Sequence, residues 1–197
     1  MARPIILASA SPFRRQLMTN AGMNFEWKES EIDERAIEQA AALSDPAAIA
    51  LLLATEKART VSRRHVDALV IGCDQTMSLE NEVLHKSAST EEARQTLKHL
   101  AGRSHRLNSA IVIAINGQPV WDHVGVAELT MRRFSDSFLD RYMEIAGEAV
   151  LRSVGAYQLE GIGIQLFERI DGDYFTIIGL PLLPLLQQLR QMGEMDE

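Results

Sequence analysis

The chain has 197 residues, of which 46% are hydrophobic, and its formal net charge at pH 7 is −7. This length suits one domain, or two small lobes that share a core. Lys and Arg form no cluster along the sequence, so we expect no nucleic-acid binding. A polyphosphate substrate stays compatible with the negative charge, because cations close to a ligand matter more than the net charge.

Three further features predict where the protein works. Cys73 is the only cysteine, which excludes an internal disulfide and suits a reducing cytoplasm. The N-terminal apolar run is short and soon reaches arginines, so we expect no signal peptide. No stretch approaches the roughly 20 apolar residues of a membrane span. We therefore expect a cytoplasmic protein without membrane association.

The first informative stretch, residues 4–15, reads PIILASASPFRR. Residues 4–8 form a short apolar run of buried-strand type. Ser11 stands before a proline, as an N-cap stands before the first turn of a helix. Backbone N–H groups and the helix dipole, with Ser9 and Arg14 beside them, suit a phosphate at that helix start. The alternative is an ordinary capped helix whose arginines are solvated.

An acidic turn and a long helix follow. Residues 24–29 predict a short strand, and the turn at 29–34 is rich in carboxylates. These carboxylates are either solvated or able to hold a metal ion. Asp45, followed by Pro46, predicts a helix that starts there and runs to residue 64. Lys57 lies in its second half and by default is a solvated helix lysine.

The second informative stretch, residues 67–76, reads DALVIGCDQT. Residues 68–71 are a continuous apolar run of buried-strand type. Asp74 follows the predicted end of this strand, where α/β folds place functional side chains. We expect Cys73 beside it to be a buried packing residue, as free cysteines usually are.

The remaining pattern predicts a mixed sheet. Asn116-Gly117 joins two strand-like runs as a hairpin turn, so antiparallel strands stand beside the parallel-type ones. The other predicted elements are helices at 12–21, 89–102, 135–146 and 181–193, a hairpin at 77–84, and strands at 105–115, 120–131 and 173–178.

Several catalytic motifs are absent from the sequence. The histidines show no HExxH spacing, and the chain has neither a GxSxG elbow nor a GxxxxGK[ST] loop. Serines, arginines, lysines and carboxylates spread over four stretches remain. This set fits metal-assisted cleavage of a phosphoanhydride, in which positioning and charge neutralisation do most of the catalysis.

Seven segments, in order, resemble those of the Maf proteins, a family of nucleoside triphosphate pyrophosphatases. They are LASASPFRR, EIDER, EKA, GCDQT, the segment around Lys86, GAYQLEGIG and GDYFTIIGLPL. The resemblance covers about residues 5–189. One departure is Ser87, where the family usually has proline, and it puts the shape of that loop in doubt.

The resemblance implies a fold and an assembly. The fold would be α/β with a mixed sheet, of the kind also seen in inosine triphosphatases. Residues 1–197 would form a single elongated domain with two lobes and the active site in a central cleft. Family members are often homodimers.

The resemblance also implies roles for individual residues. Asp74 matches the catalytic carboxylate, which acts as proton acceptor. Other polar site positions are matched by Ser9, Arg14, Glu34, Lys57 and Lys86. Lys57 and Lys86 would neutralise the leaving pyrophosphate, and Glu34 with Asp74 would hold a divalent cation, magnesium or manganese. The expected reaction cleaves a nucleoside triphosphate between its α and β phosphates.

Three positions are expected to select the base. One subgroup of the family has arginine, threonine and glutamine there and acts on dTTP and UTP. The other has an aromatic residue, glutamine and glutamate and prefers 7-methyl-GTP; Phe13, Gln75 and Glu160 resemble this second set. A glutamate can accept two N–H groups of guanine, and an aromatic ring can stack on a cationic base. As an alternative, Phe13 is an ordinary packing residue.

Two other functions stay open at this point. One is a nucleotide-binding regulator of cell division with weak or no turnover. Asp74, Lys57 and Lys86 favour an enzyme, because binding alone does not need them all. The other is a pyrophosphatase that prefers dTTP or UTP over 7-methyl-GTP. Preference for 7-methyl-GTP would suit a house-cleaning role against modified nucleotides.

Overall fold

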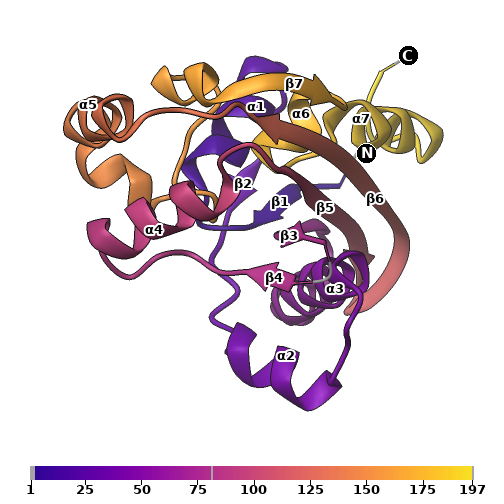
Figure 1. The fold of residues 1–197 in the computed structure, drawn as a ribbon. Coiled ribbons are helices and arrows are strands. Elements are labelled where there is room, and N and C mark those ends of the chain that lie inside the picture. Colours follow the sequence, from indigo (N-terminus) through magenta and orange to yellow (C-terminus); the bar gives the residue numbers. More distant parts are fainter. Residues whose placement is uncertain (1–2, 81, 197) are drawn as a thin grey trace. The chain divides into compact units, whose positions relative to one another are not determined.

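The structure, a computed structural model, describes residues 3–80 and 82–196. In this part of the chain, seven strands form one sheet (Figure 1). They are β1 (Ile5–Ala8), β2 (Glu26–Trp27), β3 (Leu69–Leu79), β4 (Glu82–Leu84), β5 (Ser104–Ile115), β6 (Gln118–Met131) and β7 (Phe167–Asp171). Their order is β2-β1-β3-β5-β6-β7, with β4 paired to β3.

The sheet is mixed, which confirms the predicted α/β class. Strand β1 is parallel to β2 and β3, whereas β4 and β7 are antiparallel to β3 and β6. The turn between β5 and β6 has positive φ at both Asn116 (52°) and Gly117 (72°), as a tight hairpin of this type requires. The 77–84 hairpin is confirmed by the pairing of β3 with β4; its Asn81 lies outside the described residues.

All five predicted helices are present in the described residues, and side-chain caps explain where four of them start. The helices are α1 (Pro12–Asn20), α2 (Glu34–Ala41), α3 (Pro46–Arg64), α4 (Thr90–Leu100), α5 (Asp136–Ala146), α6 (Tyr174–Ile178) and α7 (Leu182–Gln191), with 3₁₀ turns η1 (Gly147–Leu151) and η2 (Ile162–Leu166). The expected cap residues Ser11, Asp45, Ser89 and Ser135 each accept a backbone N–H through the side chain. Each cap thus satisfies a donor that the first helical turn leaves unpaired.

Two segments differ from the sequence-based expectation. The predicted strand at 173–178 is wrong, because α6 lies there. The Asp173 side chain caps α6 by accepting the N–H of Thr176, and Gly179 ends it at a φ of 102°. The acidic turn at 29–34 leads into α2, which was not predicted; the side chain of Asp33 caps it.

The described chain divides into two compact units. The first comprises residues 3–75, 108–125 and 173–196, and the second comprises 76–107 and 126–172 apart from 81. Three of the four boundaries fall within β3, β5 and β6, and the fourth lies between β7 and α6. The elongated outline and the central cleft stay predictions.

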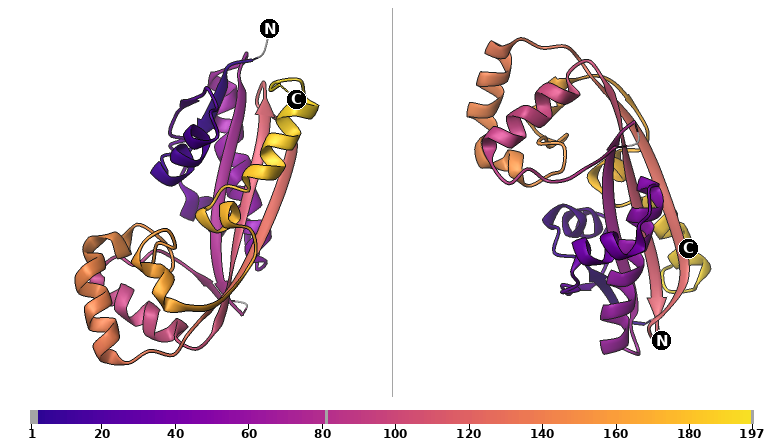
Figure 2. Two further views of the ribbon diagram at one scale, coloured as in Figure 1. Left: turned by 90° about the horizontal axis from the view of Figure 1, so that it is seen from above. Right: turned by 60° about the horizontal axis from the view of Figure 1, so that its bottom comes forward.

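The first unit has a helix layer on each face of its strands (Figure 2). On one face, β1, β3 and β5 contribute Leu7, Ile71 and Ile113 to a cluster with residues of α1 and α7. On the other face, alanines of α3 pack against alternate residues of β5, and Val61 of α3 packs with Ile6 and Val70. Burial on both faces explains why these strands read as continuous apolar runs.

In the second unit, α4, α5 and η1 pack on one another. The aromatic side chains beside them form a buried cluster: the Tyr157 and Phe167 rings meet edge to face with centroids 4.8 Å apart, and His105 contacts both. Tyr142 of α5 donates its hydroxyl hydrogen to the carbonyl oxygen of Ala156 at 3.0 Å. This bond attaches α5 to the glycine-rich loop that follows η1.

Strand β3 does not end before Asp74, as the sequence suggested, but continues to Leu79. Its parallel neighbour β1 stops at Ala8, which lies opposite Gly72. Beyond that point β3 is still paired with β5 and then with β4, so it remains a strand. Asp74 therefore lies inside β3, two residues past the end of β1.

Gly72 determines how closely α3 approaches β3. A β-carbon at this position would lie 2.2 Å from the carbonyl oxygen of Ala54 and 2.7 Å from the backbone nitrogen of Ala58. Only a glycine allows this contact between strand and helix backbones. The helix is thus held directly over the part of β3 that carries Asp74.

No helix in the described ranges is long and apolar enough to cross a bilayer.

We predict that Gly72→Ala lowers the free energy of unfolding by on the order of 1–3 kcal/mol, because the new methyl group meets immobile backbone atoms. Urea unfolding followed by circular dichroism measures the change. Gly161→Ala is the matched control, since a β-carbon there lies 3.8 Å from its nearest neighbour, the oxygen of Gln158. Equal unfolding midpoints for the two variants would contradict the close packing at Gly72.

Candidate active site

A buried lysine connects two carboxylates in the first unit. The Nζ atom of Lys57, on α3, lies 2.5 Å from Oδ1 of Asp74 and 2.7 Å from Oε1 of Glu34. Lys57 and Asp74 are both buried, whereas Glu34 is half exposed at the start of α2. The default expectation of a solvated Lys57 is therefore wrong. Its ammonium group crosslinks α3, β3 and α2.

Arg14 connects three further segments. Its Nε donates to the carbonyl oxygen of Gly179 at 2.8 Å, and its Nη1 donates to Ser9 Oγ at 3.2 Å and to the carbonyl oxygen of Cys73 at 2.9 Å. Within the described residues, no protein acceptor bonds the Nη2 group. Two N–H donors of a half-buried guanidinium thus stay available to an anion.

The start of α1 has the features predicted for it. Ser11 is the N-cap, and its Oγ accepts the N–H of Arg14 at 3.4 Å. Ser9 lies buried at the end of β1, and its Oγ also accepts the N–H of Ser11 at 3.3 Å. Phe13, on the first turn of α1, is half buried.

The side-chain amide nitrogen of Gln75 is fully engaged by the protein. Its Nε2 lies 2.8 Å from Ser109 Oγ and 3.1 Å from the carbonyl oxygens of both Thr176 and Ile177. Ser109 is itself buried and donates its hydroxyl hydrogen to Thr176 O at 2.7 Å. Gln75 therefore bonds β3 to the last turn of α6.

Cys73 behaves as the packing residue expected from the sequence. It is fully buried in the cluster on the α1 face of the sheet, and burial raises the pKa of its thiol to about 11. Such a thiol stays protonated at neutral pH and is a poor nucleophile.

Lys86 and Glu160 belong to the second unit. Lys86 is exposed in the segment between β4 and α4, and Glu160 is exposed in the turn that precedes η2. In the described parts of the chain, neither side chain has an ion pair or hydrogen bond with another residue. Both charged groups are therefore accessible to a ligand.

The loop that carries Glu160 is anchored by buried groups. Tyr157 donates or accepts a 2.7 Å hydrogen bond with Nε2 of His105, and its backbone N–H bonds Ser153 Oγ at 3.1 Å. Further along, a β-carbon on Gly163 would lie 2.4 Å from the oxygen of Gln158, so the chain can double back only with glycine there. The loop thus holds Glu160 on a packed base.

Burial also shifts the pKa values of the side chains that anchor this loop. Removal from water disfavours the charged imidazolium and lowers the pKa of His105 to about 4. The same cause raises the pKa of Tyr157 and, to about 12, that of Tyr142. All three side chains are therefore neutral at physiological pH.

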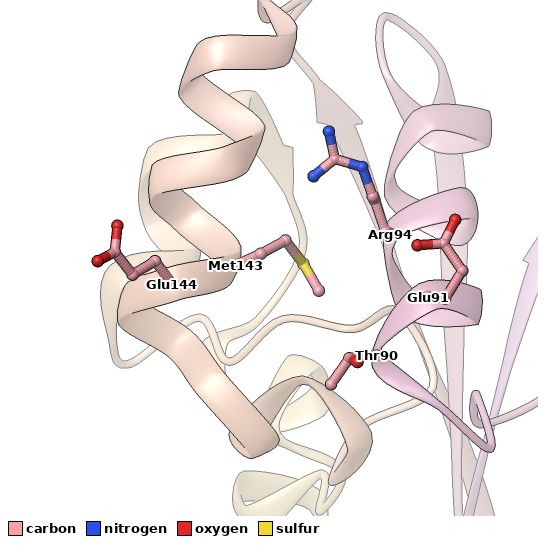
Figure 3. Close-up of a pocket in the computed structure, with 5 residues that line it drawn as sticks. All are labelled: Thr90, Glu91, Arg94, Met143 and Glu144. Carbon is pink, nitrogen blue, oxygen red and sulfur yellow. The ribbon is translucent and has the colours of Figure 1, made fainter.

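A separate pocket of about 360 Å³ lies between α4 and α5 in the second unit (Figure 3). It is lined by Thr90, Glu91, Arg94, Met143 and Glu144. None of these is a predicted site residue. The guanidinium of Arg94 is paired with the Asp140 carboxylate at 2.6 Å.

The residues present fit a divalent cation when a phosphate supplies further ligands. Within the described ranges there is no group of three or more His, Cys, Asp or Glu side chains that could hold a metal. Glu34 and Asp74 do converge on one ammonium group, each through a single oxygen, and each has a second oxygen that is not bonded to Lys57. Magnesium is commonly held by one or two carboxylates together with substrate phosphates.

Sequence reasoning missed the part played by the α6 segment. The backbone oxygens of Thr176, Ile177 and Gly179 accept the bonds from Gln75 and Arg14. The signals were present in the sequence, because Asp173 is a cap residue and Gly179 is a helix-ending residue. The apolar run between them also fits a short strand, and this pattern favours a strand over the helix that forms.

Known proteins resemble this chain over almost its entire length. The family described as Maf-like protein matches residues 4–192. A 7-methyl-GTP pyrophosphatase of Rhizobium meliloti (strain 1021) is 58% identical over 194 residues, 98% of each chain. A protein of the same name from Bartonella quintana (strain Toulouse) is 48% identical over 193 residues, again 98% of each chain. A nucleoside triphosphate pyrophosphatase of Bradyrhizobium diazoefficiens is 52% identical over 187 residues, 95% of this chain and 93% of that relative.

We predict that acid destabilises the protein through His105. Unfolded histidine takes up a proton near pH 6.5, but folded His105 does so only near pH 4, so its contribution to stability falls as the pH drops through this window. Between pH 7 and pH 5 this amounts to about 2 kcal/mol. Urea unfolding of wild type and His105→Gln at both pH values measures it. The wild type should lose more stability than the variant; equal losses would show that His105 does not titrate in this way.

Proposed function

The chain belongs to the Maf family, and on this premise we propose that it hydrolyses nucleoside triphosphates to the monophosphate and pyrophosphate. The observation that carries the proposal is the cluster of Lys57, Asp74 and Glu34 beside Arg14. It combines buried cationic donors with carboxylates, which is the combination that phosphoanhydride cleavage needs.

Arg14 and the start of α1 are the proposed phosphate-binding elements. The Nη2 group supplies two charge-assisted donors, and the other guanidinium bonds fix its plane. Ser9 lies beside it, and the positive end of the α1 dipole adds to the attraction for an anion. Lys86 is proposed as a further cation, which neutralises charge on the leaving pyrophosphate.

Asp74 is the proposed proton acceptor. A water molecule attacks the α phosphorus, and the bond from this phosphorus to the oxygen that joins it to the β phosphorus breaks. Pyrophosphate leaves, and the water proton passes to a carboxylate oxygen of Asp74. The 2.5 Å bond from Lys57 to Oδ1 holds the carboxylate in one orientation. Oδ2 is the oxygen that this bond leaves, either for the water or for the divalent cation proposed below.

Glu34 and Asp74 are the proposed ligands of a divalent cation, magnesium or manganese. Such an ion would neutralise phosphate charge and polarise the phosphoryl oxygens. Glu34 is half exposed, so it can turn toward a phosphate-bound ion without leaving a buried charge unpaired. A homodimer and a cytoplasmic location, which the family resemblance implies, stay predictions.

The proposed preferred substrate is 7-methyl-GTP. Several relatives carry this name, and Phe13, Gln75 and Glu160 are the residues proposed to contribute to the choice. The carboxylate of Glu160 is exposed and unpaired in the described structure, so it can accept two guanine N–H groups. A pyrimidine carbonyl in the same place would face a carboxylate and be repelled.

We predict that Asp74→Asn lowers kcat on the order of 100-fold or more while the protein stays folded. The amide keeps an oxygen for Lys57 but cannot accept the water proton. Pyrophosphate release measures kcat, and circular dichroism with thermal melting checks the fold. Asp67→Asn, an exposed aspartate just before β3, is the matched control and should leave kcat unchanged. Near-normal turnover of folded Asp74→Asn would remove this carboxylate from the mechanism.

We predict that the wild type has a higher kcat/KM for 7-methyl-GTP and GTP than for dTTP and UTP. Glu160→Gln should narrow this preference by about tenfold or more, because each charge-assisted bond contributes roughly 1.5–3 kcal/mol and an amide both donates and accepts. Glu168→Gln, exposed on β7, is the control. A wild type that favours dTTP or UTP would exclude the 7-methyl-GTP assignment, and absence of pyrophosphate release from every nucleotide would favour a binding protein.

A further inference from the structure

We propose that Gln75 is a positioning residue, which fixes the end of α6 and through Gly179 sets the orientation of the Arg14 guanidinium. The inference rests on the proposed function, because it takes Arg14 as a phosphate ligand. It assigns to Gln75 an effect on the binding of every triphosphate, whatever its base. Any contribution of Gln75 to the choice of base then falls to its side-chain oxygen, because its N–H groups are already used.

The N–H groups of the Gln75 amide are all used by acceptors within the protein. Three acceptors lie within 3.1 Å of Nε2: Ser109 Oγ, Thr176 O and Ile177 O. An amide nitrogen has two hydrogens, so these acceptors already exceed its donors. No N–H of Gln75 remains for a nucleobase.

The chemistry of the acceptors fixes which way the amide points. Two of them are backbone carbonyl oxygens, which cannot donate, so a flipped amide would place its own oxygen against both. Ser109 completes the arrangement, because its hydroxyl donates to Thr176 O at 2.7 Å and therefore accepts from Gln75. The network has one consistent set of donors and acceptors.

Gly179 links the end of α6 to the side chain of Arg14. It follows directly on the α6 turn that Gln75 holds, and its carbonyl oxygen accepts the Nε hydrogen of Arg14 at 2.8 Å. A β-carbon added to it would lie 3.4 Å from Arg14 Nε and 3.7 Å from Gln75 Cδ. The side of Gly179 that would carry a β-carbon therefore faces both Arg14 and Gln75, and its φ of 102° suits a residue without a β-carbon.

The consequence for Arg14 is geometric. Gly179 O and Cys73 O hold two of its nitrogens, and the planar guanidinium then directs Nη2 to one place. If the end of α6 shifts, Gly179 O moves and the plane of the guanidinium turns with it. Loss of the Gln75 amide should thus weaken phosphate binding without any contact between Gln75 and phosphate.

Inorganic tripolyphosphate is the probe, because it has the charged groups of the substrate and no base. Its dissociation constant is measured by calorimetry for wild type, Gln75→Met and Ser109→Ala, and KM and kcat are measured with 7-methyl-GTP, GTP and UTP. We expect Gln75→Met to raise the dissociation constant of tripolyphosphate about tenfold and to raise KM for the three nucleotides by a similar factor. Ser109→Ala, which breaks the network from the other side, should act in the same direction.

A double-mutant cycle separates positioning from general damage. In an Arg14→Ala background, Gln75→Met should change tripolyphosphate affinity less than about twofold, since the group that it positions is gone. Gln16→Met removes an exposed amide from α1 and is the matched control, with tripolyphosphate affinity as in the wild type. Circular dichroism and melting verify that each variant folds.

The outcomes separate this inference from the proposed function. Unchanged tripolyphosphate affinity in Gln75→Met, together with an altered ratio of kcat/KM among the nucleotides, would overturn the inference and leave the hydrolase standing. Equal effects of Gln75→Met with and without Arg14 would also overturn it. If no nucleotide is hydrolysed but tripolyphosphate binding depends on Gln75 through Arg14, the inference stands and the proposed reaction fails.

Discussion

The ammonium group of Lys57 lies inside the first unit, where a single charge without partners would cost several kcal/mol. It is stabilised there because Asp74 and Glu34 both contact it. Gly72 and the alanines of α3 that face the sheet let this helix lie against β3 at backbone distance, since none of them carries a side chain that would separate helix from strand. The small residues of this interface thus place Lys57 and Asp74 close together.

Arg14 and Gln75 show a second relation between chemistry and architecture. Each uses its N–H groups to hold backbone oxygens of other segments: Arg14 bonds Cys73 and Gly179, and Gln75 bonds α6. The atoms that remain are few and point in fixed directions. A ligand therefore meets groups whose conformational entropy was lost when the chain folded, which lowers the free-energy cost of ordering them on binding.

Much of the fold could be predicted from local signals. The caps at Ser11, Asp45 and Ser135 determine where three helices start, and a two-residue turn determines the β5–β6 hairpin, because short-range hydrogen bonds decide these features. The pattern identifies Asp74 but not its place inside β3, because the length of this strand depends on pairing with β5, which begins only at Ser104. The salt bridges of Lys57 and the contacts of Gln75 join segments remote in sequence, and no local pattern specifies them.

The bond from Arg14 to Gly179 joins residues 165 positions apart, and the contacts of Gln75 with α6 span 101 and 102 positions. During synthesis, which proceeds from the N-terminus, α1 and β3 exist long before their partners in α6 have been made. A nascent chain that stops short of Gly179 therefore contains Arg14 but not the carbonyl that orients it. The anion site can form only when nearly the whole polypeptide has left the ribosome, so it cannot help to guide the earlier steps of folding.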